Sequence, residues 1–159
     1  MEKVLESKVK VRFQDCDPFN HLNNSKYIDY FINAREDQLI NHYDLNIYEH
    51  VKKFGKGWVV SSSQISYFRP ALLMEEVVIE SQLVAFTNRV LKVEMKMWNA
   101  DKTILKSVFW SEFTHFDLMK QKTASHSPEL TALFEGVVNP IQQSSFEKRC
   151  EELRFELVS

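Results

Sequence analysis

Residues 12–27 carry the sequence RFQDCDPFNHLNNSKY, which separates a predicted strand from a predicted long helix. Upstream, Val9, Val11 and Phe13 alternate with charged residues, a period of two that predicts a first strand. Downstream, residues 26–43 contain neither glycine nor proline, and the Asn and Ser residues just before them are good helix caps. The loop between the two elements concentrates carboxylates, carboxamides, a thiol and an imidazole. Such loops on a rigid scaffold are where functional sites usually lie.

The predicted helix of residues 26–43 has a wide apolar surface. One face and its two borders carry Tyr27, Ile28, Tyr30, Phe31, Ile32, Ala34, Gln38, Leu39 and Ile40. A helix that is apolar around so much of its circumference must be covered on several sides. We therefore expect a buried central helix.

The middle of the chain predicts β-structure. Four runs rich in β-branched and aromatic residues, 58–68, 77–86, 91–98 and 103–116, end at turn-like residues. The short connections between them favour antiparallel pairing. Ser127 and Pro128 begin a predicted helix that ends near Glu135, and a weaker pattern predicts a helix over 146–157. These elements indicate an α+β fold, an antiparallel sheet holding one long helix, in a single domain over residues 1–159.

Composition and charge exclude several classes of protein. The chain has 159 residues, a formal net charge of −2 and 44% hydrophobic residues, which is typical of a globular domain. It has only 3 glycines, placed so that no glycine-rich nucleotide loop can be written. Interspersed charges argue against a nucleic-acid partner, and no apolar run approaches the roughly 18 residues that span a membrane. The N-terminus lacks a signal-peptide pattern, so we expect a cytoplasmic protein.

The two cysteines and the histidine of the loop show no metal-binding pattern. Cys16 and Cys150 fit neither a C-x-x-C motif nor a zinc spacing, and either two free thiols or one disulfide is compatible with them. No second ligand stands at metal spacing from His21, so no metal site is expected. Cys16 lies between two aspartates, which disfavour a thiolate, so a small buried side chain is the preferred interpretation over a nucleophile.

Asp17 is the most suggestive residue of the loop because it shortly precedes the N-terminus of the predicted helix. Free amides and the helix dipole favour negative charge there, and such amides can hold the oxyanion of a reacting acyl group. A carboxylate beside them has the parts for thioester hydrolysis, by direct attack or by activating a water. The simpler interpretation is that Asp and Asn residues at this position only form turns and caps.

The spaced motif Asp-x-Asp-x-x-x-His-x-Asn-Asn-x-x-Tyr at residues 15–27 resembles a known signature. It is similar to that of hot-dog-fold acyl-CoA thioesterases, the 4-hydroxybenzoyl-CoA thioesterase family and its relatives acting on fatty acyl-CoA. The likeness continues with Tyr30-Phe31, Ala34-Arg35, Gly57-Trp58 and Tyr67-Phe68-Arg69-Pro70. It implies a hot-dog fold, an antiparallel sheet wrapped around a long central helix. The core would span about 8–117, with a helical extension over about 127–157, and the activity would be acyl-CoA thioester hydrolysis without a cofactor.

The resemblance also implies roles for residues of the loop. Asp17 takes the place of the catalytic carboxylate, and the backbone N–H of Asn24 would polarise the thioester carbonyl. His21 and Asn23 would shape or orient the site, while Asp15 would help to hold the loop. Relatives usually have glycine directly before the histidine, where this chain has Asn20, a residue that tolerates left-handed backbone conformations.

Further implied contacts concern the substrate and a second copy of the chain. Tyr27 is either a substrate contact or a core residue. Arg69, with Arg89 and Lys92, is a candidate for binding the phosphates of CoA. Proteins of this family join their sheets edge to edge as dimers, often paired into tetramers, with the active sites at the interface. We therefore expect a homodimer or homotetramer, since one short sheet leaves an edge that needs protection.

Two other functions remain compatible with the motif. A hot-dog hydratase or dehydratase acting on an enoyl thioester would need a base, usually a histidine paired with a carboxylate, and His21 could serve only if it faces the pocket. A non-catalytic module that binds acyl thioesters is the other alternative. Asp17 argues against it, because a bound acyl group gains little from a buried charge.

Overall fold

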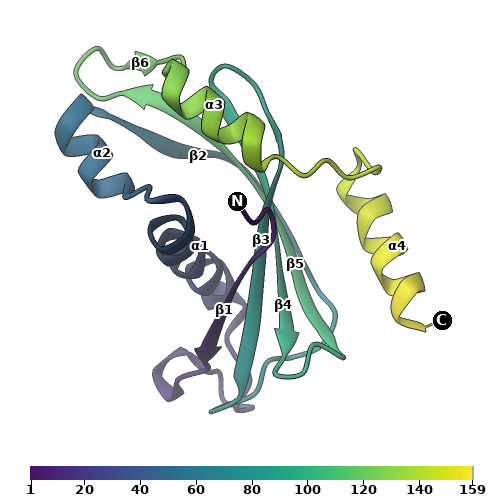
Figure 1. The fold of residues 1–159 in the computed structure, drawn as a ribbon. Coiled ribbons are helices and arrows are strands. Elements are labelled where there is room, and N and C mark those ends of the chain that lie inside the picture. The colour runs from purple at the N-terminus through teal and green to yellow at the C-terminus, as the bar shows by residue number, and fades with distance from the viewer. Residues whose placement is uncertain (159) are drawn as a thin grey trace.

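A curved antiparallel sheet forms the centre of the protein, which we describe from a computed structural model covering residues 1–158 (Figure 1). Its strands lie in the order β1-β3-β4-β5-β2, and a short β6 pairs with β5. Their bounds are β1 Leu5–Lys10, β2 Lys56–Tyr67, β3 Glu76–Phe86, β4 Val90–Asn99, β5 Leu105–Asp117 and β6 Lys122–Thr123. The predicted α+β hot-dog architecture is confirmed, and so are the four predicted runs of the middle of the chain.

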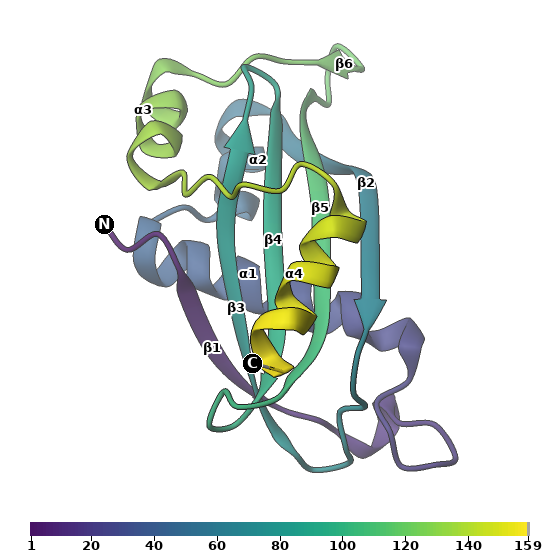
Figure 2. The same cartoon turned by 90° about the vertical axis from the view of Figure 1, so that its right-hand side faces the viewer.

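Helix α1 (Tyr27–Tyr43) packs on one face of this sheet, as Figures 1 and 2 show. The five residues of its predicted apolar face are all buried: Tyr27, Tyr30, Phe31, Ala34 and Gln38. The expectation that the helix is covered on several sides is wrong for the single chain. Ile40 is 39% exposed and Ile28, Ile32 and Leu39 are only partly buried, because the sheet covers just one side of α1.

The first strand is shifted relative to its prediction. β1 covers Leu5–Lys10, whereas the alternation suggested a strand reaching Phe13. Val11 is buried, but its N–H bonds to Glu75 outside the sheet ladder, and Phe13–Asp15 then form a short 3-10 helix in which Phe13 is 76% exposed. The alternating pattern therefore continues past the point where the chain leaves the sheet.

Helix α2 (Ile47–Phe54) was not predicted, although its ends carry clear signals. The Oδ1 atom of Asn46 accepts hydrogen bonds from the N–H groups of Tyr48 and Glu49 at 3.0 and 3.2 Å. Gly55 ends the helix with φ +65°, a left-handed conformation that glycine adopts without strain. The helix is only 8 residues long, too short to be recognised by its periodicity.

Two C-terminal helices complete the fold. Helix α3 (Pro128–Val137) is capped by Ser127 as predicted, and it runs two residues beyond the expected end, through Gly136. Helix α4 (Phe146–Val158) lies on the side of the sheet opposite α1 (Figure 2). It packs Cys150 and Leu153 against Trp110 and thereby creates a second apolar core. Residues 1–158 contain no helix that is long and apolar enough to cross a membrane.

Candidate active site

A cleft opens where the N-terminus of α1 meets the C-terminal end of β2. Its empty volume is about 640 Å³, open mouth included. The residues that line this Asp17 cleft are Asp17, His21, Leu22, Asn24, Tyr27, Tyr67, Phe68, Arg69 and Pro70. The structure thus brings together five of the six predicted site residues, all except Asn23.

Asp17 is held rigidly by its own loop. Its Oδ1 atom accepts hydrogen bonds from the N–H groups of Phe19 at 2.9 Å and His21 at 3.1 Å. The Asp17 N–H in turn donates to the carbonyl of His21 at 2.8 Å, and Asn20 turns the chain with φ 62°. This left-handed conformation of Asn20 agrees with the expectation that asparagine tolerates the turn directly before His21. No residue of the described chain donates to Oδ2, which leaves that oxygen available to a substrate or a water.

The start of the helix presents an unsatisfied amide to the same cleft. Asn23 is a cap: its Oδ1 atom accepts from the Ser25 N–H at 3.0 Å and from the Ser25 hydroxyl at 2.9 Å. Asn24 begins the 3-10 turn Asn24–Lys26 that leads into α1, and within residues 1–158 its N–H has no acceptor. Free N–H groups at a helix start favour a negative or polarised oxygen. Asn23 therefore positions this amide without lining the cleft.

Two tyrosines form the wall opposite the loop. Tyr27 is 2% exposed, and its hydroxyl accepts from the Ala71 N–H at 3.1 Å, so it is a core residue with one edge in the cleft. Tyr67 packs edge-on against Tyr27 and donates its hydroxyl hydrogen to the carbonyl of Asn24 at 3.2 Å. Burial raises the pKa of both phenols, so they are neutral at pH 7. Tyr67 and Phe68 line the cleft although their place in the motif did not predict them as site residues.

Asp15 and Cys16 belong to the loop but do not line the cleft. The Asp15 carboxylate accepts from the Tyr30 hydroxyl at 2.6 Å, which ties the loop to α1. Burial and this hydrogen bond raise the pKa of Tyr30 to about 12. Cys16 and Cys150 are free thiols. Burial, and then the charges of Asp17 and Asp15, raise the pKa of the Cys16 thiol, which disfavours the nucleophilic thiolate.

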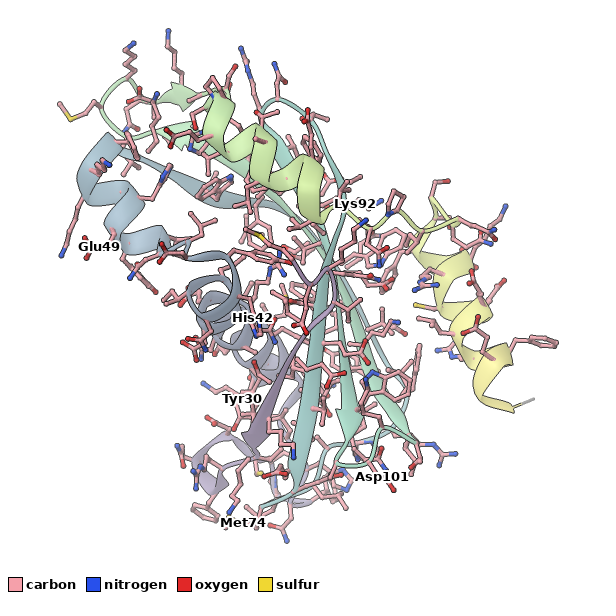
Figure 3. All side chains as sticks on the ribbon, in the orientation of Figure 1. Tyr30, His42, Glu49, Met74, Lys92 and Asp101 are labelled. Atoms are coloured by element: carbon pink, nitrogen blue, oxygen red, sulfur yellow. The ribbon has the colours of Figure 1, made fainter. Side chains whose placement is uncertain are left out.

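The predicted cationic residues separate into two groups. Arg69 lies at the rim of the Asp17 cleft. Lys92 lies on the α4 side of the sheet with its Nζ atom 4.1 Å from the ring centre of Trp110 (Figure 3). Arg89 donates to the hydroxyl of Thr123 at 3.0 Å, beside β6. Within this chain, Arg69 alone of the three could meet the phosphates of a ligand in the cleft.

The arrangement limits the chemistry that is available. Among the described residues, no three His, Cys, Asp or Glu side chains are grouped as metal ligands. The ring of His21 makes no hydrogen bond to a carboxylate in the described chain, so the paired base that a hydratase requires is not formed there. The cleft instead combines a carboxylate with one free oxygen, a free amide at a helix start and a cationic rim. Together these groups suit the addition of water to a polarised acyl carbonyl.

Comparisons with known proteins point in the same direction. The sequence model of the thioesterase-like superfamily matches residues 11–134. The chain is 26% identical over 136 residues to the long-chain acyl-CoA thioesterase FadM of Escherichia coli (strain K12), covering 84% of this chain and 99% of that protein. The DHNA-CoA thioesterase of Staphylococcus aureus has a TM-score of 0.78 at 15% identity, covering 86% of this chain and 91% of that one. Another Staphylococcus aureus protein, solved in complex with CoA, has a TM-score of 0.77 at 13% identity, with coverages of 91% and 92%.

Proposed function

This chain belongs to the thioesterase-like superfamily and is a thioester hydrolase of the hot-dog fold, and on that premise we propose that it hydrolyses acyl-CoA thioesters with Asp17 as the catalytic carboxylate. The observation that carries the proposal is that Asp17 and Asn24 line one cleft, and that the N–H of Asn24 has no acceptor within residues 1–158. The FadM relative is named for the same class of substrate, and one structural neighbour was solved with CoA bound.

The reaction adds one water across the acyl C–S bond. The thioester carbonyl oxygen accepts a hydrogen bond from the Asn24 N–H, which stabilises the negative charge that develops on it. Asp17 either takes a proton from the attacking water or attacks the acyl carbon itself, forming an anhydride that water then cleaves. The C–S bond breaks in both routes, and the products are the free acid and CoA with its thiol. The two N–H groups on Oδ1 orient the carboxylate so that Oδ2 faces the substrate.

The other residues of the cleft position the substrate. Arg69 at the rim would pair with a phosphate of CoA, because a guanidinium binds phosphate with two parallel hydrogen bonds. Tyr67 holds the helix start by its bond to the Asn24 carbonyl. His21 lines the cleft and orients the loop through the two bonds between its backbone and Asp17.

We further propose that the active form is a homodimer formed through β2. This strand is 12 residues long, lies at the edge of the sheet, and is exposed throughout residues 59–64. An unpaired edge of this length invites another strand, and a second copy of β2 supplies one by two-fold symmetry. Tyr67 at the end of β2 lines the Asp17 cleft, so the partner would lie beside the site.

The decisive experiment measures the turnover of a panel of acyl-CoA substrates with short, long and aromatic acyl groups. The release of free CoA thiol is the readout. We expect wild type to release CoA, and Asp17→Ala to lower kcat by about 10²- to 10⁴-fold. Asp37→Ala removes an exposed carboxylate from α1 and is the matched control, with wild-type rates. The proposal fails if wild type releases no CoA above background with any substrate, or if Asp17→Ala is as active as wild type.

The dimer has a separate test. Val59→Lys places a charge on the exposed part of β2, close to its own copy across the two-fold axis, and should shift the light-scattering mass toward the monomer. The same substitution at the exposed Asn33 of α1 should leave the mass unchanged. A monomeric wild-type protein would contradict the dimer and leave the hydrolysis test unaffected.

A further inference from the structure

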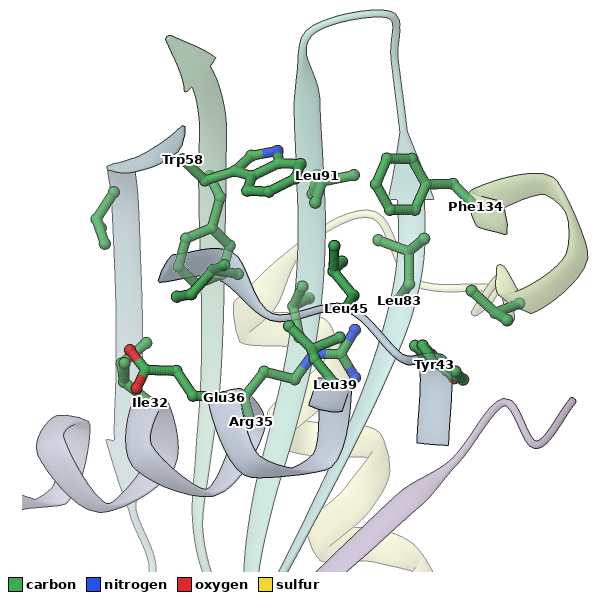
Figure 4. Close-up of a pocket in the computed structure, with 15 residues that line it drawn as sticks. Ile32, Arg35, Glu36, Leu39, Tyr43, Leu45, Trp58, Leu83, Leu91 and Phe134 are labelled. Atoms are coloured by element: carbon green, nitrogen blue, oxygen red, sulfur yellow. The ribbon is translucent and has the colours of Figure 1, made fainter. Parts of the chain in front are cut away.

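A second and more apolar cavity lies between the C-terminal half of α1 and the sheet, away from the Asp17 cleft (Figure 4). Its empty volume is about 870 Å³, open mouth included, and most of its walls are aliphatic or aromatic. The walls include Leu39 on α1, Leu45 between α1 and α2, Leu83 and Leu91 on the sheet, and Phe134 on α3. Apolar walls with few polar groups are typical of small-molecule sites.

One charged group is buried in this cavity. The Arg35 side chain extends from α1 among the wall residues, as Figure 4 shows, and the residue is only 8% exposed. Its Nη1 atom donates to the hydroxyl of Ser81 at 2.8 Å. Ser81 in turn donates to Gln38, and Gln38 donates to the hydroxyl of Ser7 at 2.8 Å. This chain of neutral groups holds the guanidinium in place and leaves its charge unneutralised.

No carboxylate of the described side chains lies within ion-pair distance of Arg35. The nearest candidate by sequence, Glu36, also lines the cavity, but its carboxylate accepts from the Tyr48 hydroxyl at 2.9 Å. The hydroxyl of Tyr43, another wall residue, donates to the carbonyl of Glu2 at 2.6 Å. Burial lowers the pKa of Arg35 to about 10, so the group is still a cation at pH 7. A buried guanidinium without an anion is costly, and the cavity leaves room for one.

We propose that this Arg35 cavity binds a carboxylate that carries an apolar body, with the carboxylate on the Arg35 guanidinium and the body against the leucine walls. The planar guanidinium matches a carboxylate with two parallel hydrogen bonds, and apolar walls exclude small hydrophilic anions. The source of the ligand rests on the proposed function: the ligand belongs to the class of acid that the enzyme releases. The site is separate from the Asp17 cleft, since Arg35 lies about 12 Å along α1 from Tyr27.

Binding of decanoate, compared with 1-decanol, tests the proposal directly by calorimetry. The Asp17→Ala protein is used as the parent, so that the result does not depend on catalysis. We expect decanoate to bind, and Arg35→Gln to weaken it about 10- to 100-fold by removing a charge-assisted hydrogen bond. The affinity for 1-decanol should stay unchanged in the same variant. Equal affinity of decanoate for the parent and for the Arg35→Gln variant would overturn the proposal, as would no binding at all.

Three further variants keep the test decisive if Arg35→Gln folds poorly. Arg35→Lys retains the cation and should retain most of the decanoate affinity. Leu91→Trp fills the cavity while Arg35 remains, and should abolish decanoate binding. Arg154→Gln removes one positive charge from the α4 side and should bind decanoate like the parent. Decanoate binding that survives Leu91→Trp would place the ligand elsewhere and overturn the proposal.

A second arm distinguishes a free acid from a carboxylate at the far end of a bound acyl chain. The mono-CoA thioester of decanedioic acid is compared with decanoyl-CoA, using enzyme with Asp17 intact. If Arg35→Gln lowers kcat/KM for the mono-CoA thioester of decanedioic acid but not for decanoyl-CoA, then Arg35 binds the carboxylate at the far end of the acyl chain. Equal kcat/KM ratios for the two thioesters, with decanoate binding still dependent on Arg35, support the free acid. If no thioester is hydrolysed, the proposed function fails and the binding result still stands.

Discussion

The two faces of the sheet differ in whether a buried charge has an ion-pair partner within the chain. On the α4 face, the Glu94 carboxylate accepts from Arg149 Nε at 2.8 Å, Arg149 Nη2 at 2.9 Å, Trp110 Nε1 at 2.9 Å and Gln82 Nε2 at 3.0 Å. On the α1 face, the guanidinium of Arg35 donates to the hydroxyl of Ser81 at 2.8 Å and has no ion-pair partner among residues 1–158. The first charge is fully neutralised inside the protein, whereas the second is not.

The pKa values of these groups reflect that difference. Burial alone would raise the pKa of Glu94, but the hydrogen bonds from Arg149 and Trp110 hold it below its usual value. The same bond to Glu94 raises the pKa of Arg149. Arg35 has no such partner, and burial lowers its pKa to about 10. We infer that the buried charge on the α4 face is neutralised within the chain, while the buried charge on the α1 face is left for a group that residues 1–158 do not supply.

The largest change in the free energy of unfolding should come from breaking the ion pair between Glu94 and Arg149. Arg149→Met removes the cation that is hydrogen-bonded to the buried Glu94 carboxylate and leaves only the Lys96 ammonium, 3.8 Å away. We expect the free energy of unfolding in urea to fall by about 3 kcal/mol. Adding Glu94→Gln to Arg149→Met removes the stranded charge and should restore most of that loss. If the single variant loses less than the double variant, the pair does not hold α4 on the sheet.

A smaller effect should appear on acidification, from histidines at the α2 and α3 end of the α1 face. The Nε2 atoms of His50 and His115 lie 3.1 Å apart, and Trp58 donates to Nε2 of His126 at 3.1 Å. Burial, and then the neighbouring His115 and His50, lower the pKa of His126 to about 4. Burial also lowers the pKa of His50 and His115, where Lys56 opposes protonation and Asp117 favours it at His115. These three histidines are therefore neutral at pH 7.

The sign of the pH effect follows from these depressed pKa values. An unfolded histidine titrates near 6.5, so stability contributed by neutral His126 is complete above that pH and is lost as the pH falls toward 4. The expected loss between pH 7 and pH 4.5 is about 1–2 kcal/mol, after allowance for solvent screening. Glutamine at position 126 cannot be protonated, so the free energy of unfolding of His126→Gln should fall by about 1–2 kcal/mol less than that of wild type over the same pH range. Urea unfolding at a series of pH values measures this difference. An unchanged profile in this variant would assign the acid sensitivity to other groups.

Removing the positive charge of Arg35 should raise the free energy of unfolding, whereas removing Arg149 should lower it. Arg35→Met replaces an unneutralised buried charge by an apolar side chain of similar length, and we expect the unligated protein to become more stable by about 1 kcal/mol. Thermal or urea unfolding without added ligand measures it. A loss as large as that of Arg149→Met would mean that Arg35 is as well satisfied inside the chain as Arg149.

The smallest effect concerns a solvated charge on the α4 side. Lys92→Met removes the ammonium over the Trp110 ring while retaining the aliphatic contact, and should cost about 0.5 kcal/mol in urea unfolding. A loss above about 2 kcal/mol would show that Lys92 belongs to the buried Glu94 network. Arg35 and Arg149 are equally buried, so the difference expected between them follows from whether the chain neutralises the charge.

Much of the Asp17 cleft could be predicted because its parts are close together in the sequence. Asp17, His21 and Asn24 lie in one loop, and their relative positions follow from a turn and a helix cap. The prediction that the first strand reaches Phe13 is wrong, because β1 ends three residues earlier at Lys10 and Phe13 is turned outward. The side chain of Asn23 caps the helix, and its role in shaping or orienting the site stays a prediction. Such details depend on local hydrogen bonding that a periodic pattern does not record.

The positions of the strands, of the long helix and of the loop that contains Asp17 follow from the sequence alone, because the patterns that predict them involve residues only a few positions apart. Which buried charges are neutralised depends on tertiary packing. Glu94 meets Arg149 across 55 positions, and Arg35 meets Ser81 across 46. In the sequence, Arg35 and Arg149 are both arginines on amphipathic helices. The physical difference arises when the sheet places a carboxylate opposite Arg149 and an apolar cavity opposite Arg35.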